Sequence, residues 1–105
     1  MSRGIALKLS EMGFSALAVS GVGGTSFALI ESIRAEKAGD DKNARYGRTF
    51  SDWGIPTPIS IIEANVGLPI IASGGIRDGL KMARSLALGA GICAVGRPFL
   101  DKGVT

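Results

Sequence analysis

Two glycine turns, each followed by an arginine, form an anion-binding pattern in this sequence. Gly74-Gly75-Ile76-Arg77 follows one apolar run directly, and Gly96-Arg97 follows the next. N–H groups at the start of a helix are unpaired and attract anions, glycine lets a phosphate approach the backbone, and arginine adds charge-assisted hydrogen bonds. The two turns therefore predict one phosphate held between neighbouring loops. The expected contacts are Gly75, Ile76, Arg77, Gly96 and Arg97.

A third glycine-rich segment, Gly21-Val22-Gly23-Gly24, is flanked by two hydroxyl side chains. Ser20 and Thr25 are placed to hydrogen-bond a ring or polyol oxygen of a cofactor. An alternative role for Thr25 is to cap the N-terminus of the helix that follows. The glycine spacing does not match the dinucleotide-binding pattern G-x-G-x-x-G, so that fingerprint is absent from the chain.

Side chains for catalysis or metal binding are scarce. The chain contains no histidine and a single cysteine, Cys93, which lies within an apolar run. Ser-His-Asp, Cys-His and histidine-ligated zinc chemistry are therefore excluded from this chain, as is an internal disulfide. Glu31 and Glu63 fall within expected helices, and we interpret them as solvated surface residues. No catalytic residue and no metal ligand is assigned.

Composition limits the class of partner. The 105 residues carry 12 basic and 9 acidic side chains, a net charge of +3, and the basic residues are scattered along the chain. Neither a basic block nor interleaved aromatic residues are present, so we expect no nucleic-acid partner. No segment approaches the ~20 apolar residues of a membrane span, and the N-terminus has no apolar signal core, so we expect a cytoplasmic protein with no membrane partner.

The arrangement of apolar residues predicts the elements that position these loops. Three short apolar runs are typical of strands buried on both faces, and four segments show helical spacing. Thr57 is expected to be the N-cap before Pro58, and the polar segment 38–52 is expected to be a long exposed loop. The expected strands are 15–20, 68–73 and 92–95, and the expected helices are 2–12, 26–37, 58–65 and 78–88.

Buried strands separated by helices imply parallel pairing through right-handed crossovers. A doubly wound sheet and a piece of a barrel would both satisfy this order. A complete (β/α)₈ barrel needs roughly 250 residues, so a chain of this length cannot close one. In either architecture the loops after the strands gather at the carboxyl edge of the sheet, where parallel α/β proteins bind ligands.

Three motifs resemble the FMN-dependent type 2 isopentenyl diphosphate isomerase family. They are SGVGGTSF at residues 20–27, DWGIPT at 52–57 and SGGIRDG at 73–79, in the same order and over essentially the whole chain. The runs ALGA at 87–90 and GRP at 96–98 are shared more widely among FMN-dependent barrels. The resemblance implies an α/β fold in which residues 1–105 form part of a (β/α)₈ TIM barrel, from about helix 5 to strand 8.

The resemblance also implies a function. The family interconverts isopentenyl and dimethylallyl diphosphate with reduced FMN, Mg²⁺ and NADPH. By this resemblance Ser20 and Thr25 contact FMN, and the loops at 75–77 and 96–97 contact its phosphate. Arg97 departs from the less basic pair found in much of the family. The family's substrate and metal residues come from the first half of the barrel, so this chain is expected to be inactive alone.

Two alternatives remain at the level of sequence. FMN-dependent 2-hydroxy-acid dehydrogenases and oxidases resemble the last two loops, but their base is a histidine where this chain has Val22, which cannot abstract a proton. A stand-alone phosphate-binding module is the second alternative. Because a partial sheet has two exposed edges, we also expect a homo-oligomer or a marginally stable chain.

Overall fold

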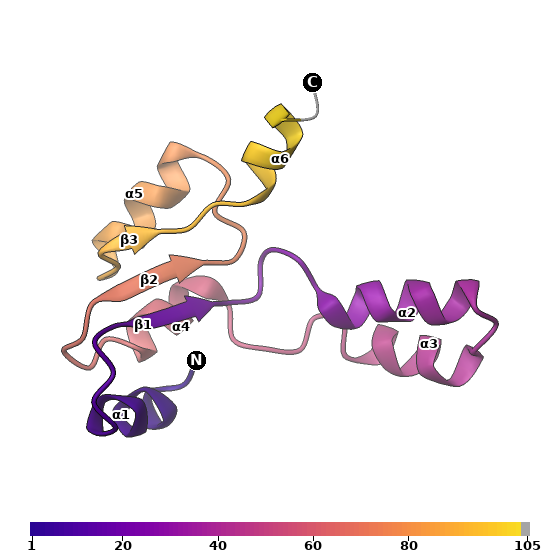
Figure 1. Cartoon of the computed structure of the whole chain (residues 1–105), viewed down its shortest axis with the longest axis horizontal. Helices are drawn as coiled ribbons and strands as arrows, with labels where there is room; N and C mark the ends of the chain where they lie inside the picture. The colour runs from indigo at the N-terminus through magenta and orange to yellow at the C-terminus, as the bar shows by residue number, and fades with distance from the viewer. Residues whose placement is uncertain (104–105) are drawn as a thin grey trace. The chain divides into compact units, whose positions relative to one another are not determined.

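Three short parallel strands form a sheet in the computed structural model, which describes residues 1–103 (Figure 1). They are β1 (Leu17–Ser20), β2 (Ile70–Ser73) and β3 (Ile92–Cys93). Each strand pairs with the next one along the chain, with Leu17 opposite Ile70 and Ile71 opposite Ile92. The predicted parallel α/β fold is therefore confirmed. Sequential order is typical of a barrel segment, whereas a doubly wound sheet reverses its order.

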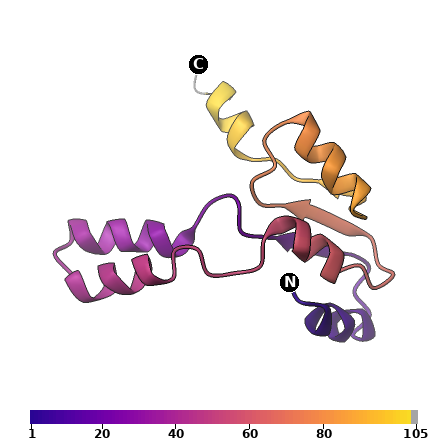
Figure 2. The same cartoon turned by 180° about the vertical axis from the view of Figure 1, so that it is seen from behind.

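Helices cover one face of this sheet. α4 (Thr57–Glu63) contacts β1 and β2, and α5 (Gly79–Ala87) contacts β3, as the view from behind in Figure 2 shows. α1 (Arg3–Glu11) is the first helix of the chain and α6 (Arg97–Gly103) is the last. The core beneath the helices consists of alternate strand residues and a few helical ones. It includes Leu17, Val19, Ile70, Ala72, Ile61, Ala64 and Ala6.

The opposite face of the sheet is uncovered by residues 1–103. Ala18 and Ser20 are exposed, and Ile92 is 63% exposed. The prediction that the strands are buried on both faces is therefore wrong for this chain. The strands are apolar at successive positions and do not alternate with polar residues. This pattern suits a second covering layer, because parallel sheets bury both faces. The described residues supply only the layer on the helix side.

The packing face of α5 also differs from the expected one. The helical spacing of the apolar residues in this segment predicts an inward face made of Leu80, Ala83, Leu86 and Ala87, but all four are exposed. Met82, Ser85 and Leu88 face the sheet instead. Both sets have helical spacing, so periodicity alone does not distinguish the face that packs on the strands from a face that lies open in this chain.

Residues 25–54 form a second compact unit, a helical hairpin. It contains α2 (Phe27–Lys37) and α3 (Asp41–Thr49), which lie side by side in both views (Figures 1 and 2). The helices meet through small residues: Ser32 Oγ donates to the carbonyl of Ala44 at 2.6 Å, and a methyl group at Gly47 would lie 2.7 Å from Cβ of Ser32. Close approach of two helices therefore replaces a large apolar core here.

The segment 38–52, expected to be a loop, contains α3. The sequence shows no apolar pattern for this helix, because the side of α3 that contacts α2 presents Ala44 and Gly47 instead of large apolar residues. The signal that does mark the helix is Asp40, whose carboxylate accepts from the backbone N–H of Asn43 at 3.1 Å. Asp is a favoured N-cap because it satisfies an otherwise unpaired N–H group.

Acid is expected to weaken α3 through Asp40. The hydrogen bond from the backbone of Asn43, and a second from its side-chain amide at 2.6 Å, hold the pKa of Asp40 below its usual value. A lowered folded-state pKa means that this stabilisation is present above the unfolded-state pKa of about 3.9 and is lost as the pH falls through the folded-state value. We expect the protection factor of the Asn43 amide, which is the intrinsic exchange rate at each pH divided by the observed rate, to fall on acidification. Asp40→Asn keeps an N-cap and removes the titration, so an equal acid response in that variant would contradict the assignment.

The N-terminal caps predicted for two other helices are not the observed ones. Ser26, not Thr25, caps α2, with its Oγ accepting from Leu29 N at 3.2 Å, so the capping alternative for Thr25 is wrong. Thr57 is also not a cap: α4 begins at Thr57 itself, after Pro56, with no side-chain capping bond.

Among residues 1–103, the longest apolar stretch of any helix falls short of what a bilayer crossing needs.

Candidate phosphate-binding site

The glycine loops after β1 and β2 pack against each other backbone to backbone. Gly74 and Gly75 have φ angles of +99° and +77°, in the left-handed region that side chains with a Cβ disfavour. A methyl group at Gly75 would overlap the carbonyl of Gly23, and one at Gly24 would lie 2.7 Å from Gly75 N. The chain therefore needs glycine on both sides of this contact, at the carboxyl edge of the sheet.

The turn after β2 leaves backbone donors unused. Within residues 1–103, the N–H groups of Gly75, Ile76 and Arg77 have no hydrogen-bond acceptor, although Ile76 is only 5% exposed. Unpaired N–H groups near buried backbone are rare in folded proteins, and successive ones form concavities that bind anions. These donors precede α5, whose N-terminus is capped by Asp78 through a bond from Lys81 N. The turn thus fits a phosphate oxygen.

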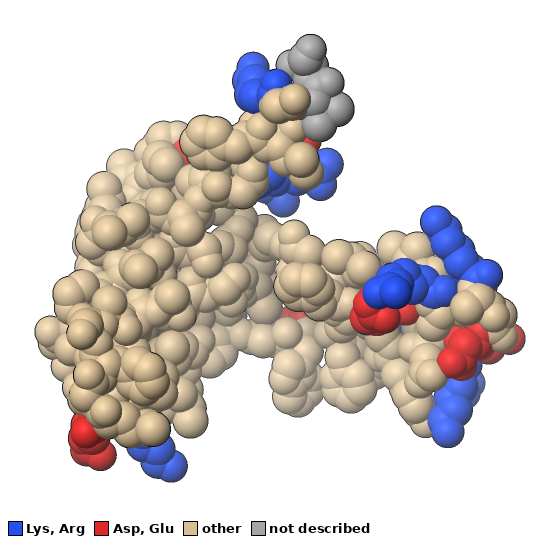
Figure 3. All heavy atoms as spheres, viewed as in Figure 1, with Lys and Arg blue, Asp and Glu red and all other residues tan. Residues whose placement is uncertain are grey.

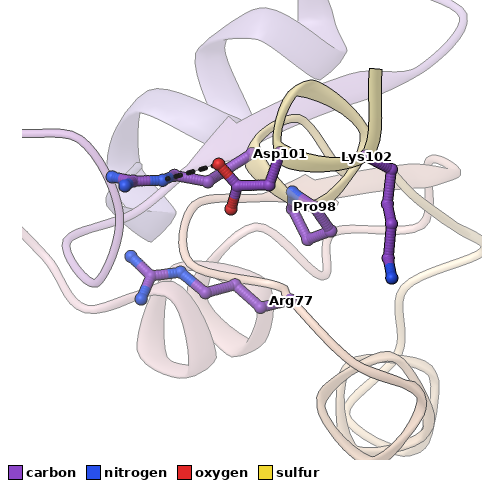
Figure 4. Close-up of a pocket in the computed structure, with 5 residues that line it drawn as sticks. Arg77, Pro98, Asp101 and Lys102 are labelled. Carbon is purple, nitrogen blue, oxygen red and sulfur yellow. Dashed lines mark ion pairs between the residues drawn. The ribbon is translucent and has the colours of Figure 1, made fainter. Parts of the chain in front are cut away.

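Arg77 and Arg97 line one open pocket of about 520 Å³. Figure 4 shows Arg77 on the loop after β2 and the other labelled residues on α6. Pro98, Asp101 and Lys102 complete the lining. In the space-filling view, basic side chains gather around α6 with little acidic surface beside them (Figure 3). The two arginines expected to bind a phosphate thus line one pocket, Arg77 from the loop after β2 and Arg97 from the start of α6.

Asp101 is a member of this pocket that sequence patterns did not single out. Its carboxylate lies 3.6 Å from Arg97 Nε, one turn along α6, and the two side chains are 62% and 73% exposed. An exposed pair of this kind contributes little to stability, about 0–1 kcal/mol. The i, i+4 spacing of Arg97 and Asp101 was visible in the sequence and could have indicated the pair.

Removing the charge of Asp101 is expected to strengthen anion binding in the pocket. Asp101→Asn frees Arg97 and takes a negative charge away from the incoming phosphate, so the affinity for inorganic phosphate is expected to rise about threefold at low salt and less at high salt. Isothermal titration at two ionic strengths measures this. Glu11→Gln makes the same change in net charge away from the pocket and is expected to leave the affinity unchanged. Equal gains from both variants would contradict a local effect.

Ser20 and Thr25 belong to different compact units. Ser20 ends β1 opposite Ser73 and is exposed on the uncovered face of the sheet. Thr25 is exposed at the start of the hairpin unit. Both positions leave the hydroxyl groups accessible, and their contacts with a cofactor stay predictions.

The side chains that could bind a metal ion do not gather in one place among residues 1–103. Among residues 1–103 no three acidic or cysteine side chains come together as metal ligands. Cys93 is half-buried, with Sγ directed to the carbonyl of Met82 at 3.9 Å. No Mg²⁺ ligand is therefore assigned among the described residues, and no step is derived through the metal.

Comparison with known proteins agrees with the motifs. Residues 1–102 match the family described as FMN-dependent dehydrogenase. Curated relatives named isopentenyl-diphosphate delta-isomerase are 49% identical over 100 residues in Methanosarcina barkeri, 46% over 102 residues in Pyrococcus furiosus and 46% over 107 residues in Nostoc sp.. These alignments cover 95%, 95% and 99% of this chain.

The same alignments cover 27%, 25% and 30% of the relatives, so the chain spans between a quarter and a third of their length. The resemblance to the isomerases seen in the motifs is confirmed by these identities. The family match extends over nearly the whole chain, including both glycine-arginine turns. On this ground the chain belongs to the FMN-dependent dehydrogenase family.

Proposed function

We propose that this chain is the phosphate-binding part of an FMN-dependent isopentenyl-diphosphate isomerase. In this proposal β1, β2 and β3 correspond to strands six to eight of a (β/α)₈ barrel. The uncovered face of the sheet then faces the barrel interior, which strands from the remainder of such a barrel would close. The names of the relatives and the sequential strand order support the assignment.

One observation carries the cofactor assignment. The turn after β2 presents three N–H groups that have no acceptor among residues 1–103, and its Arg77 shares a pocket with Arg97 at the start of α6. Backbone donors and two guanidinium groups can together neutralise and orient a phosphate dianion. A phosphate pinched between the last two strand loops is a recurrent arrangement in barrels.

The chain's own residues would position the cofactor. Gly75, Ile76 and Arg77 would hold phosphate oxygens from one side, and Gly96 and Arg97 from the other. Ser20 and Thr25 would hydrogen-bond the polyol or ring oxygens. When bound, reduced FMN supplies the reactive flavin ring. No acid or base that touches an isoprenoid diphosphate is assigned to this chain, so we expect no isomerisation by the chain alone even with Mg²⁺ and NADPH present.

One residue, Val22, argues against the alternative that this chain belongs to a 2-hydroxy-acid dehydrogenase or oxidase. The family's name covers dehydrogenases, but Val22 occupies the position of their histidine base. Its backbone N–H donates to Ile55 O at 2.9 Å, and its carbonyl accepts from Thr57 N at 3.2 Å. Val22 therefore has a structural role in joining the loop after β1 to the start of α4, and no group there can abstract a proton.

Flavin titration of the native chain tests the proposal. FMN and riboflavin differ only by the phosphate, so a phosphate grip predicts that FMN binds at least about tenfold tighter, since charge-assisted bonds contribute about 1.5–3 kcal/mol each. Quenching of flavin fluorescence measures both dissociation constants. Inorganic phosphate is expected to compete with FMN. Equal affinities for the two flavins, or no binding of FMN, would contradict the proposed function.

A further inference from the structure

Thr57 lies at the junction of the two packed glycine loops and is 5% exposed. Its backbone N–H donates to the carbonyl of Val22, in the loop after β1, at 3.2 Å. Its hydroxyl donates to the carbonyl of Gly74, in the loop after β2, at 2.6 Å, with the carbonyl of Ser73 at 3.3 Å. One residue therefore ties both loops to the start of α4.

The hydroxyl acts on the peptide that presents the first anion donor. Gly74 C=O and Gly75 N–H belong to the same peptide group, which is trans in this chain. In a trans peptide these two bonds point in opposite directions. Holding the Gly74 carbonyl toward Thr57 therefore turns the Gly75 N–H away from Thr57, and this N–H has no acceptor in the part of the chain that the structure describes.

The glycine turn needs such a constraint. Gly74 and Gly75 have φ angles of +99° and +77°, a conformation that the glycine backbone alone does not enforce, so contacts from outside the turn must hold it. A buried hydroxyl without its acceptor is costly, which favours the arrangement that keeps the Thr57 bond. The site would then be preorganised before the phosphate arrives, which raises affinity by reducing the ordering cost of binding.

We propose that Thr57 is a positioning residue that sets the phosphate-receptive conformation of the Gly74-Gly75 turn through its hydroxyl. The inference rests on the proposed phosphate site. It assigns to this threonine, whose sequence context indicated only a helix cap, the control of FMN selectivity over riboflavin. Thr57 acts through the Gly75 peptide and does not itself contact the phosphate.

Two variants separate the hydroxyl from the shape of the side chain. Thr57→Val keeps the β-branched shape and removes the donor, and Thr57→Ser keeps the donor. We expect Thr57→Val to weaken FMN binding about tenfold with little change for riboflavin, so the ratio between the two flavins collapses. Thr57→Ser is expected to retain the ratio of the native chain within about threefold.

The outcomes distinguish this inference from the proposed function. Equal losses for FMN and riboflavin in Thr57→Val would show a merely structural role and overturn the inference. Loss of the flavin ratio in Thr57→Ser, which also serves if the valine variant does not fold, would overturn it too. A native chain that fails to bind FMN contradicts the proposed function itself.

A measurement without ligand tests the positioning step directly. The backbone amide resonances of Gly75 and Ile76 in the free chain are expected to shift in Thr57→Val and to stay near their native positions in Thr57→Ser. The Leu17 amide, which donates to Pro69 O at 2.9 Å at the start of β1, is the internal control and is expected to keep its position in both variants. Unchanged Gly75 and Ile76 resonances in Thr57→Val would overturn the inference whatever the flavin titrations show.

Discussion

Replacing Gly75 with alanine is expected to abolish FMN binding and to destabilise the sheet unit. Gly75 has φ = +77°, which costs a residue with a Cβ about 1–2 kcal/mol. The new methyl group would also overlap the carbonyl of Gly23 and lie 3.2 Å from Gly24 N. The two loops would have to separate, which moves the N–H groups of Gly75 and Ile76 from the anion site. Flavin titration and thermal unfolding measure the two effects.

Gly79→Ala is the matched control for this prediction. Gly79 lies four residues away, at the first position of α5, with an ordinary φ and, among residues 1–103, no atom within 4 Å of an added Cβ. Alanine there is expected to leave FMN binding intact and to raise stability slightly, because glycine is a poor helix former. A Gly75→Ala chain that binds FMN as well as the Gly79→Ala chain would refute the packed-loop account of the site.

Replacing the arginines is expected to remove the preference for FMN over riboflavin. Arg77→Ala and Arg97→Ala each remove a guanidinium from the pocket and are expected to weaken FMN binding about tenfold, given about 1.5–3 kcal/mol for a hydrogen bond to a charged group. The double variant is expected to lose up to about a hundredfold, with less if the two arginines share one phosphate oxygen. Riboflavin affinity is expected to be unchanged in all three.

Arg3→Ala controls for the loss of positive charge. Arg3 begins α1 and does not line the pocket. It is expected to change FMN affinity by less than about twofold, and that residual effect is expected to vanish at high salt because exposed distant charges are screened. A loss as large as that of Arg77→Ala would indicate a general charge effect and not a phosphate grip.

The parts of the fold that the sequence predicts well depend on local signals. The apolar runs that became β1, β2 and β3 are bounded by glycine, and the expected helix 78–88 begins with Asp78, which caps α5. Parallel pairing followed from the alternation of strands and helices. The glycine-arginine turns were identifiable because an anion site needs backbone donors, glycine and positive charge in one short segment.

The parts that were missed depend on contacts distant in sequence. α3 packs through Ala44 and Gly47 on α2, a contact that leaves no apolar stripe in the sequence. The sequence did not show which face of the strands and of α5 packs within this chain. An apolar residue gives the same pattern whether or not residues 1–103 supply the layer that covers it. Thr57 resembles a helix cap locally, and only its contacts with Val22 and Gly74 show a different role.

The position of the phosphate tests the account most directly. Amide spectra of the ¹⁵N-labelled native chain, recorded as FMN is added, report which backbone N–H groups meet the ligand. The account predicts the largest shifts at Gly75, Ile76, Gly96 and Arg97, and inorganic phosphate is expected to move the same resonances. Shifts confined to other residues, such as those of α1 or α3, or an unchanged spectrum at saturating FMN, would contradict it.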